Sequence, residues 1–190
     1  MKILGISGSL RRDSYNSALL RAAAELLPDD FELKIWEGLK AVPPYDQDDD
    51  TAEAPAAVAE LRAAFAGADA VLIATPEYNA SVPGHLKNAL DWVSRPVATN
   101  PLRNKPAAVV GASTGAFGAV WAQAELRKVL ATIGGRVLPN EVAVRHADSC
   151  FEDGRLVDEG VRAQLEEALD ELVAATRARA EAQTAVPFAA

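Results

Sequence analysis

Three short segments of this 190-residue chain carry residue types that could bind an anionic ligand. The first segment follows the apolar run Ile3–Ile6 and reads Ser-Gly-Ser-Leu-Arg-Arg over residues 7–12. A helix is expected to begin near Ser14, so free main-chain N–H groups and the helix dipole would face a bound anion. We interpret the segment as a phosphate-binding loop. Its candidate donors, hydroxyl, amide and guanidinium groups, belong to Ser9, Arg11, Ser14, Asn16 and Ser17.

This first loop does not match two better-known nucleotide-binding patterns. No Gly-Lys-Ser/Thr closes it, which argues against a P-loop ATPase. Gly5 and Gly8 are not followed by a third glycine at the offset that a Gly-x-Gly-x-x-Gly dinucleotide site requires. A purely structural alternative stays open, in which Ser14 is only a helix N-cap and Gly8 only a turn residue.

The second and third segments each follow a continuous apolar run. Pro76-Glu77-Tyr78-Asn79 follows residues 70–74, and Ser113-Thr114-Gly115 follows residues 106–112. Tyr78 offers a flat apolar surface with a polar tip, and Gly115 allows the backbone to approach a ligand closely. Taken alone, each segment is better explained structurally, the second as a plain turn with Tyr78 as a lid on the core and the third as a glycine-containing entry into the next helix.

The hydrophobic pattern predicts the elements that must position these loops. Continuous apolar runs indicate strands buried on both faces, whereas residues 31–36 alternate as an edge strand does. Five strands alternate with five helices, which predicts an α/β fold: a flavodoxin-like, doubly wound, five-stranded parallel sheet with strand order 2-1-3-4-5 and helices on both faces. The predicted helices are 14–27, 52–67, 83–92, 119–133 and 159–179. The remaining strands are the apolar run Ile3–Ile6 and residues 68–75, 106–112 and 136–144, the last interrupted at Pro139-Asn140. Residues 151–158 are predicted as a turn.

The predicted topology brings the three segments together. Ligands of open parallel sheets bind beyond the carboxyl ends of the strands, where the strand order reverses. That point lies between the first and third strands, and the loops 7–17, 76–82 and 113–118 all leave the sheet there. We therefore expect one site that holds a phosphate at the first loop and a flat ring between the other two.

At this point the sequence resembles the NAD(P)H-dependent FMN reductase family, which includes quinone, chromate and azo-dye reductases. The resemblance spans roughly Lys2 to Val144 and rests on Gly8-Ser9-Leu10-Arg11 with Ser14 and Asn16, on Pro76–Asn79, on Leu86–Trp92 and on Ser113–Gly115. It implies non-covalent FMN. The phosphate would be held by Ser9, Arg11, Ser14, Asn16 and Ser17, and the ring would be lined by Pro76, Glu77, Tyr78 and Asn79 on one side and Ser113, Thr114 and Gly115 on the other.

The sequence departs from the family pattern at His85, where an apolar residue usually follows Pro-Gly. We interpret His85 as an exposed histidine in the first turn of its helix rather than as a proton donor. The family implies a homodimer or homotetramer, and Trp92 and Trp121 are candidates for the subunit contact.

The implied activity is that of an FMN-dependent NAD(P)H oxidoreductase. NAD(P)H would stack transiently on the open flavin face, deliver a hydride and leave, and a quinone, free flavin, azo compound or metal oxyanion would then be reduced there in a ping-pong scheme. No catalytic side chain is required. The main alternative is a flavodoxin-type electron carrier without a substrate of its own. A hydrolase on the same fold would lack a nucleophile in the first loop apart from Asp13.

Composition limits the other possibilities. The net charge of −8, with basic clusters only at Arg11-Arg12 and Arg177–Arg179, argues against nucleic-acid or membrane partners. The one cysteine, Cys150, and the lack of a leader or an apolar span fit a cytoplasmic protein. The acidic run at 48–50 reads as a solvated loop and not a metal site. We expect one domain over residues 1–180 and a poorly ordered tail over 181–190.

Overall fold

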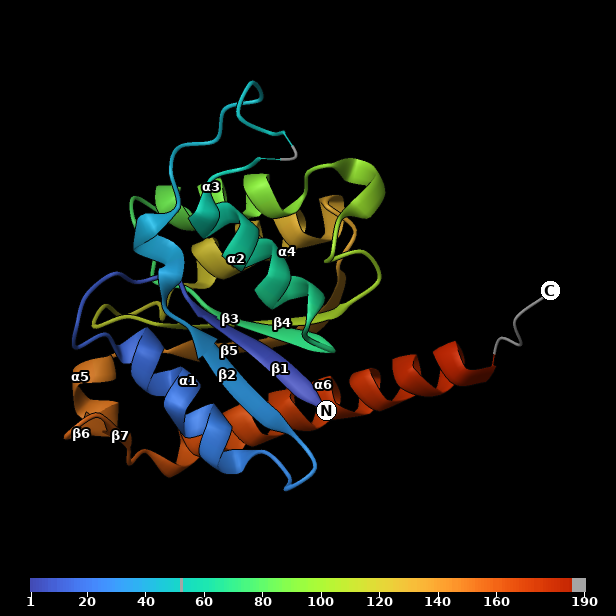
Figure 1. Cartoon of the computed structure of the whole chain (residues 1–190). Helices are drawn as coiled ribbons and strands as arrows, with labels where there is room; N and C mark the ends of the chain where they lie inside the picture. Colours follow the sequence, from blue (N-terminus) through green and yellow to red (C-terminus); the bar gives the residue numbers. More distant parts are fainter. Residues whose placement is uncertain (52, 186–190) are drawn as a thin grey trace.

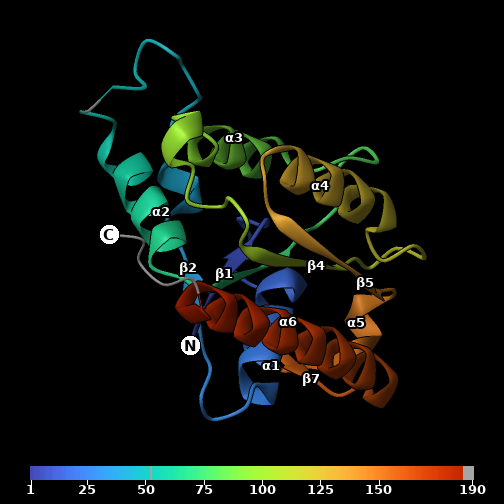
Figure 2. The same cartoon turned by 90° about the vertical axis from the view of Figure 1, so that its right-hand side faces the viewer.

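The computed structural model describes residues 1–51 and 53–185, which form a sheet covered by helices on both faces (Figure 1). Helices α1 (Tyr15–Leu26) and α6 (Glu159–Ala185) cover one face, and α2 (Ala56–Ala66), α3 (Gly84–Val93) and α4 (Val120–Thr132) cover the other (Figure 2). Strand residues alternate between the two cores: Leu72 packs towards α1 and α6, and Ile73 packs towards α2, α3 and α4.

The sheet has the predicted order and direction. Its strands are β1 (Lys2–Ser7), β2 (Glu32–Trp36), β3 (Ala70–Ala74), β4 (Pro106–Ala112) and β5 (Arg136–Val144). All neighbours pair in parallel in the order β2-β1-β3-β4-β5, which confirms the doubly wound prediction. Every residue of β3 and β4 is buried, as the unbroken apolar runs predict, whereas β2 lies at an edge with its polar residues in solvent.

Strand β5 continues through the proline that was predicted to interrupt it. Ala107 pairs with Val137, and Val109 pairs with Glu141, so the register shifts over the intervening residues. The extra residues of β5 form a bulge that contains Pro139, whose missing N–H would otherwise leave a gap in the ladder. The proline therefore changes the register of β5 without ending it.

The region predicted as a turn at 151–158 holds a small hairpin. Helix α5 (Ala147–Cys150) leads into β6 (Phe151–Glu152) and β7 (Arg155–Leu156), joined by a tight turn at Asp153 and Gly154 with φ values of 49° and 76°. Helix α6 then runs to Ala185, past the predicted end at Arg179. Residues 186–190 of the predicted tail lie outside the described residues, and the predicted domain boundary stays a prediction.

Trp92, the large aromatic residue of helix α3, belongs to the core. It is fully buried, and its indole N–H donates to the Pro43 carbonyl at 2.9 Å. Asn88 donates to the same carbonyl at 2.8 Å, which holds the long loop after η1 (Gly38–Ala41) against α3. Trp92 is therefore not available for the subunit contact that was predicted for it. Across the described ranges, no helix combines the length and the hydrophobicity needed to cross a bilayer.

Candidate functional site

The first loop ends at a capped helix. The Ser14 hydroxyl accepts from the main-chain N–H groups of Asn16 at 3.2 Å and Ser17 at 3.4 Å, so the alternative reading of Ser14 as an N-cap holds. The Ser17 hydroxyl donates to Ser7 Oγ at 2.9 Å, and the N–H of Arg11 donates to Ser9 Oγ at 3.4 Å. These short-range bonds fix the loop's path.

Asn16 has a different position from the one its predicted role needs. It is buried, and its side-chain amide donates to the carbonyl of Ala112 at 3.0 Å while its carbonyl oxygen accepts the Ala112 N–H at 3.0 Å. The side chain therefore joins the start of α1 to the end of β4. Its amide is directed at the sheet, so Asn16 positions the loop.

The first loop nevertheless keeps free groups that suit a phosphate. In the described part of the chain, the main-chain N–H groups of residues 10 and 12–15 have no hydrogen-bond partner. The first turn of α1 contains no acidic residue, so its positive end is not neutralised from within the helix. Arg11 is exposed beside these donors, and the Asp13 carboxylate is the opposing charge. The donor set fits the phosphate of FMN.

The second loop folds back as a tight hairpin. Tyr78 and Ser81 exchange two main-chain hydrogen bonds of 3.1 Å each, and the residues between them, Asn79 and Ala80, have φ values of 54° and 58°. Two positive φ values in a row are the pattern of a type I′ turn, which Asn tolerates and Ala disfavours. Strained backbone of this kind is frequent at binding sites. The turn leaves Tyr78 46% exposed rather than buried as a lid.

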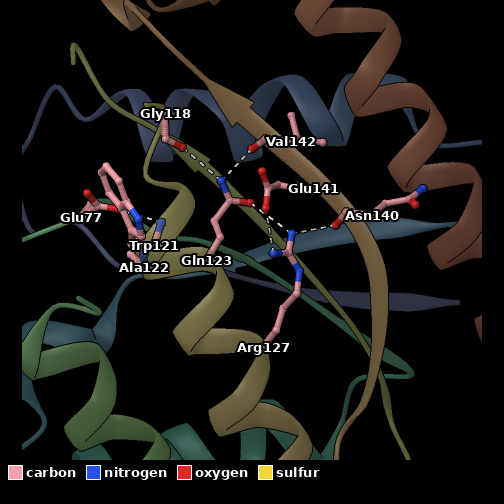
Figure 3. Close-up of polar contacts among 9 residues, drawn as sticks. All are labelled: Glu77, Gly118, Trp121, Ala122, Gln123, Arg127, Asn140, Glu141 and Val142. Atoms are coloured by element: carbon pink, nitrogen blue, oxygen red, sulfur yellow. Dashed lines mark hydrogen bonds and ion pairs between the residues drawn. The ribbon is translucent and has the colours of Figure 1, made fainter. Parts of the chain in front are cut away.

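Glu77 is directed onto the start of α4, as Figure 3 shows. Its Oε2 accepts the main-chain N–H groups of Trp121 at 3.0 Å and Ala122 at 3.1 Å. Because Ala119, the residue before α4, has no capping side chain and adopts φ 62°, Glu77 supplies the cap from another loop. This contact ties the second loop to the third.

A second carboxylate on α4 holds the other end of the hairpin. Glu125 Oε2 accepts from the Ser81 hydroxyl at 2.6 Å and from the Val82 N–H at 3.3 Å. The bond from Ser81 is the main reason why the pKa of Glu125 lies below its usual value. No sequence pattern indicates this contact, because Ser81 and Glu125 are 44 residues apart along the chain.

The third loop is held between β5 and α5. The Ser113 N–H donates to the Val144 carbonyl at 3.0 Å, and the N–H of Gly115 donates to Ser113 Oγ at 3.1 Å. Gly118 has φ +60°, and a Cβ there would lie 2.6 Å from the Ala143 carbonyl carbon. The loop can thus pass over β5 only with glycine at this position.

A buried network on α4 supports the end of this loop (Figure 3). Gln123 is fully buried, and its amide donates to the carbonyls of Gly118 at 3.1 Å and Val142 at 3.2 Å. One turn later, Arg127 donates to the Asn140 carbonyl at 2.9 Å and pairs with Glu141 at 3.3 Å. The network therefore anchors both the loop and the β5 bulge. The i, i+4 spacing of Gln123 and Arg127 was visible in the sequence, but their acceptors were not.

His85 does not lie free on the surface, so the prediction of an exposed histidine is wrong. It is half-buried, and its Nε2 lies 2.8 Å from the Gly8 carbonyl oxygen, within hydrogen-bond distance. Gly8 in turn donates its N–H to the Ala74 carbonyl at 2.8 Å. A Cβ at Gly8 would approach Leu86 to 2.8 Å, so the first loop passes directly against α3.

These contacts join the three loops in a ring. The first loop is bonded to the end of β3 through Gly8 and to the end of β4 through Asn16, and the second loop is bonded to α4 through Glu77. Four exposed large apolar side chains lie on this ring, and two of them, Phe117 and Trp121, contact each other with ring centroids 4.8 Å apart. The exposed fractions are 45% for Leu10, 46% for Tyr78, 57% for Phe117 and 48% for Trp121.

The fold and this ring of three loops define a class of protein. A flavodoxin-like sheet with free main-chain donors in the loop after β1, and with exposed aromatic side chains beside the loops after β3 and β4, offers groups that suit a phosphorylated flat ring at the carboxyl edge of the sheet. Across the described residues, no group of three or more His, Cys, Asp or Glu side chains is placed to bind a metal ion. Asp50 of the acidic loop pairs instead with Arg62 at 2.7 Å.

Comparison with known proteins gives the family. The sequence profile of the NADPH-dependent FMN reductase family matches residues 1–149. The chain is 42% identical over 174 residues to an NAD(P)H-dependent FMN reductase of Pseudomonas aeruginosa, an alignment that covers 90% of this chain and 93% of that protein. It is 41% identical over 182 residues to a 2-hydroxy-1,4-benzoquinone reductase of Burkholderia sp, covering 94% of this chain and 98% of the relative.

A solved structure agrees. The flavoenzyme NAD(P)H:(acceptor) oxidoreductase FerB of Paracoccus denitrificans superimposes with a TM-score of 0.83 at 36% identity, covering 93% of this chain and 97% of that one. The chain therefore belongs to the NADPH-dependent FMN reductase family. It is an FMN-dependent NAD(P)H oxidoreductase, and the electron-carrier alternative is not favoured.

Proposed function

We propose that this protein is an NAD(P)H:quinone oxidoreductase whose FMN is held by the ring of three loops. The observation that carries the proposal is that hydrogen bonds join the ends of β1, β3 and β4 into one ring with free donors. A relative that spans nearly the whole chain is a reductase of 2-hydroxy-1,4-benzoquinone, which supports a quinone as the acceptor.

The phosphate would lie at the start of α1. The guanidinium of Arg11 and the hydroxyl of Ser9 are the side-chain donors, and the free main-chain N–H groups up to residue 15 complete the set. Ser14 and Ser17 contribute mainly by holding the first turn in place, since their hydroxyls are engaged within the loop. Asn16 acts through its two bonds to Ala112.

The isoalloxazine ring of FMN would lie between the second and third loops. Pro76, Glu77, Tyr78 and Asn79 would line one side, with Glu77 fixing the loop through α4. Ser113, Thr114 and Gly115 would line the other, where a Cβ on Gly115 would meet only Ser113 Oγ at 3.4 Å and the ring can therefore come close. When bound, FMN supplies the hydride chemistry, and no acid or base from the chain is needed for it.

The exposed aromatic side chains support an open face of the bound flavin ring. Tyr78, Phe117 and Trp121 can contact flat molecules by stacking, and their exposure leaves room for a nicotinamide and then for a quinone. The same exposed surface suits a subunit contact, and we propose a homodimer or homotetramer with Trp121 near the interface. We further propose that the protein works in the cytoplasm on small-molecule acceptors.

The first test is spectroscopic. The purified protein should show the visible spectrum of oxidised flavin, and anaerobic NADH or NADPH alone should bleach it. Steady-state rates with a benzoquinone should give parallel double-reciprocal lines. Intersecting lines, or a colourless protein that does not bind added FMN, would contradict the proposal.

The second test concerns the phosphate. Arg11→Gln should weaken FMN binding by about 10-fold or more, because a charge-assisted hydrogen bond contributes about 1.5–3 kcal/mol. FMN affinity is measured by flavin fluorescence with the flavin-free protein. Arg12→Gln is the matched control, since it removes the same charge one residue away, and it should change the affinity by less than about threefold. Equal losses in both variants would remove Arg11 from the phosphate site.

A further inference from the structure

A groove runs along α1 from the first loop to the β6–β7 hairpin. It consists of two adjoining hollows of about 470 and 590 Å³, which share Arg21, Asp153 and Gly154 as lining residues. Helix α1 and the hairpin lie side by side in both views (Figure 1, Figure 2). The second and third loops do not line it, so the groove leads away from the proposed ring site. Its α1 wall is the stripe Ser14, Ala18, Arg21, Ala22 and Glu25.

The groove gathers arginines in a chain whose net charge is −8. Arg11 and Arg21 line the first hollow, and Arg21, Arg155 and Arg162 line the second. Within residues 1–51 and 53–185, the guanidinium groups of Arg11, Arg21 and Arg155 have no hydrogen-bond or ion-pair partner, and Arg162 pairs with Glu166 at 3.3 Å. Three carboxylates also line the groove, those of Asp13, Glu25 and Asp153.

The arrangement suits a ligand with both an anionic and a flat apolar part. Guanidinium groups bind phosphates by paired hydrogen bonds. The apolar surface between them comes from small, aliphatic and aromatic side chains, and the exposed Val157 belongs to the second hollow. These apolar lining residues are Tyr15, Ala18, Ala22, Phe151, Leu156 and Val157.

The length of the groove sets the size of the ligand. It begins at Ser14, where the proposed flavin phosphate lies, and it passes Ala22 on the same face of α1. Eight residues of helix correspond to about 12 Å at 1.5 Å per residue. That distance accommodates a nucleoside monophosphate added beyond the first phosphate, and it exceeds what FMN alone would occupy.

We propose that this groove binds the adenosine phosphate part of a dinucleotide, with Arg21 and Arg155 on its phosphate. The inference rests on the proposed function, because the groove starts at the proposed phosphate site. FAD would place the 5′-phosphate of its adenosine there, as a continuation of its flavin phosphate. NADPH would place its adenosine 2′-phosphate there, a group that NADH lacks, while its nicotinamide lies over the flavin ring.

The experiment compares Arg21→Gln and Arg155→Gln with Arg12→Gln, which removes an arginine that does not line the groove. The flavin-free full-length protein is titrated with FMN and with FAD by flavin fluorescence. The FMN-loaded protein is assayed for KM with NADPH and with NADH at a fixed quinone concentration, and for inhibition by 2′,5′-ADP.

If FAD is the source, both groove variants bind FAD about 5- to 20-fold more weakly and bind FMN as the wild type does, with a loss that shrinks as salt is raised. If NADPH is the source, the affinity for both flavins stays unchanged, while KM for NADPH and the inhibition constant of 2′,5′-ADP rise about 5- to 20-fold and KM for NADH stays constant.

The groove proposal is overturned if the two variants match the wild type in all of these measurements, if FMN and FAD weaken equally, or if Arg12→Gln has the same effect. Failure of the proposed function has a different signature, because the wild type would then neither bind FMN nor oxidise NAD(P)H. A protein that does both, with variants that change nothing, overturns only the groove.

Discussion

The two edges of the sheet differ in how their polar groups are used. At the amino edge, Lys105 is only 3% exposed, and its ammonium donates to the carbonyls of Phe65 and Ala68. Asp69 accepts the Lys2 N–H at 2.8 Å with its carboxylate and donates its own N–H to the Lys2 carbonyl at 2.8 Å. The short connection from α2 to β3 is thus fully paired there.

The carboxyl edge has the opposite character. Positive φ values occur at both edges, since Asn104 and Gly134 precede β4 and β5. Within the described residues, however, several main-chain N–H groups of the carboxyl-edge loops have no partner. Its large apolar side chains are exposed instead of buried. The difference teaches that one edge contributes mainly to stability, while the other keeps free donors and exposed apolar side chains that a ligand can use.

The largest expected effect is at the amino edge. Lys105→Met should lower the free energy of unfolding by about 2–4 kcal/mol, because it leaves two buried carbonyls without their charged donor. Urea denaturation of the flavin-free protein measures the loss. FMN affinity of the folded variant should equal that of the wild type, since the substitution lies at the other edge. The exposed Lys40→Met serves as control and should change stability by less than about 0.5 kcal/mol.

A matched pair of glycines tests the carboxyl edge. Gly118→Ala should lower the free energy of unfolding by about 1–3 kcal/mol, because φ +60° and the backbone of Ala143 exclude a Cβ. Gly115→Ala should be nearly neutral for stability, since its Cβ would meet only Ser113 Oγ at 3.4 Å.

The same pair separates strain from ligand contact. Gly115→Ala should weaken FMN binding by about 10-fold if the ring approaches this residue, a loss comparable to one disturbed hydrogen bond. Thermal unfolding and flavin titration on both variants give the two readouts. A Gly115→Ala protein that binds FMN as the wild type does would take Gly115 out of the ring site and weaken the contrast between the edges.

The smallest effect is the pH dependence at Lys105. Burial lowers the pKa of Lys105 to about 8, whereas the unfolded chain keeps the ordinary value near 10.5. Between these values the unfolded state binds more protons than the folded state, so this residue makes stability rise with pH from about 8 to 10. The expected gain, about 1–2 kcal/mol after allowance for solvent screening, should appear in the wild type and vanish in Lys105→Met. A wild-type curve parallel to that of the variant would mean that Lys105 stays charged throughout.

The architecture could be predicted because its signals are local. Fully apolar runs marked β3 and β4 as central strands, and the alternation in residues 31–36 marked an edge strand. At Pro139 the prediction was wrong because of a non-local effect, since β4 pairs on both sides of the bulge. Helix α6 also extends to Ala185, beyond its predicted end.

The positions of the site loops also followed from topology, but the roles of individual side chains did not. Asn16 resembles a phosphate ligand in sequence, yet it bonds to Ala112, which is 96 residues away along the chain. The position of His85 in the first turn of a helix predicts an exposed side chain, yet its Nε2 lies within hydrogen-bond distance of the Gly8 carbonyl in the first loop. In each case the partner is a main-chain group, and no sequence pattern marks which main-chain group a side chain will meet.

The sequence by itself determined the order of elements, the direction and order of the strands, and the edge at which the loops meet, because hydrophobic periodicity and the handedness of crossover connections are properties of the chain's local pattern. Only the tertiary structure decided which polar side chains remain available to a ligand. That choice depends on contacts such as Glu77 with the start of α4 and Gln123 with Gly118, which form when distant segments pack and satisfy buried polar groups.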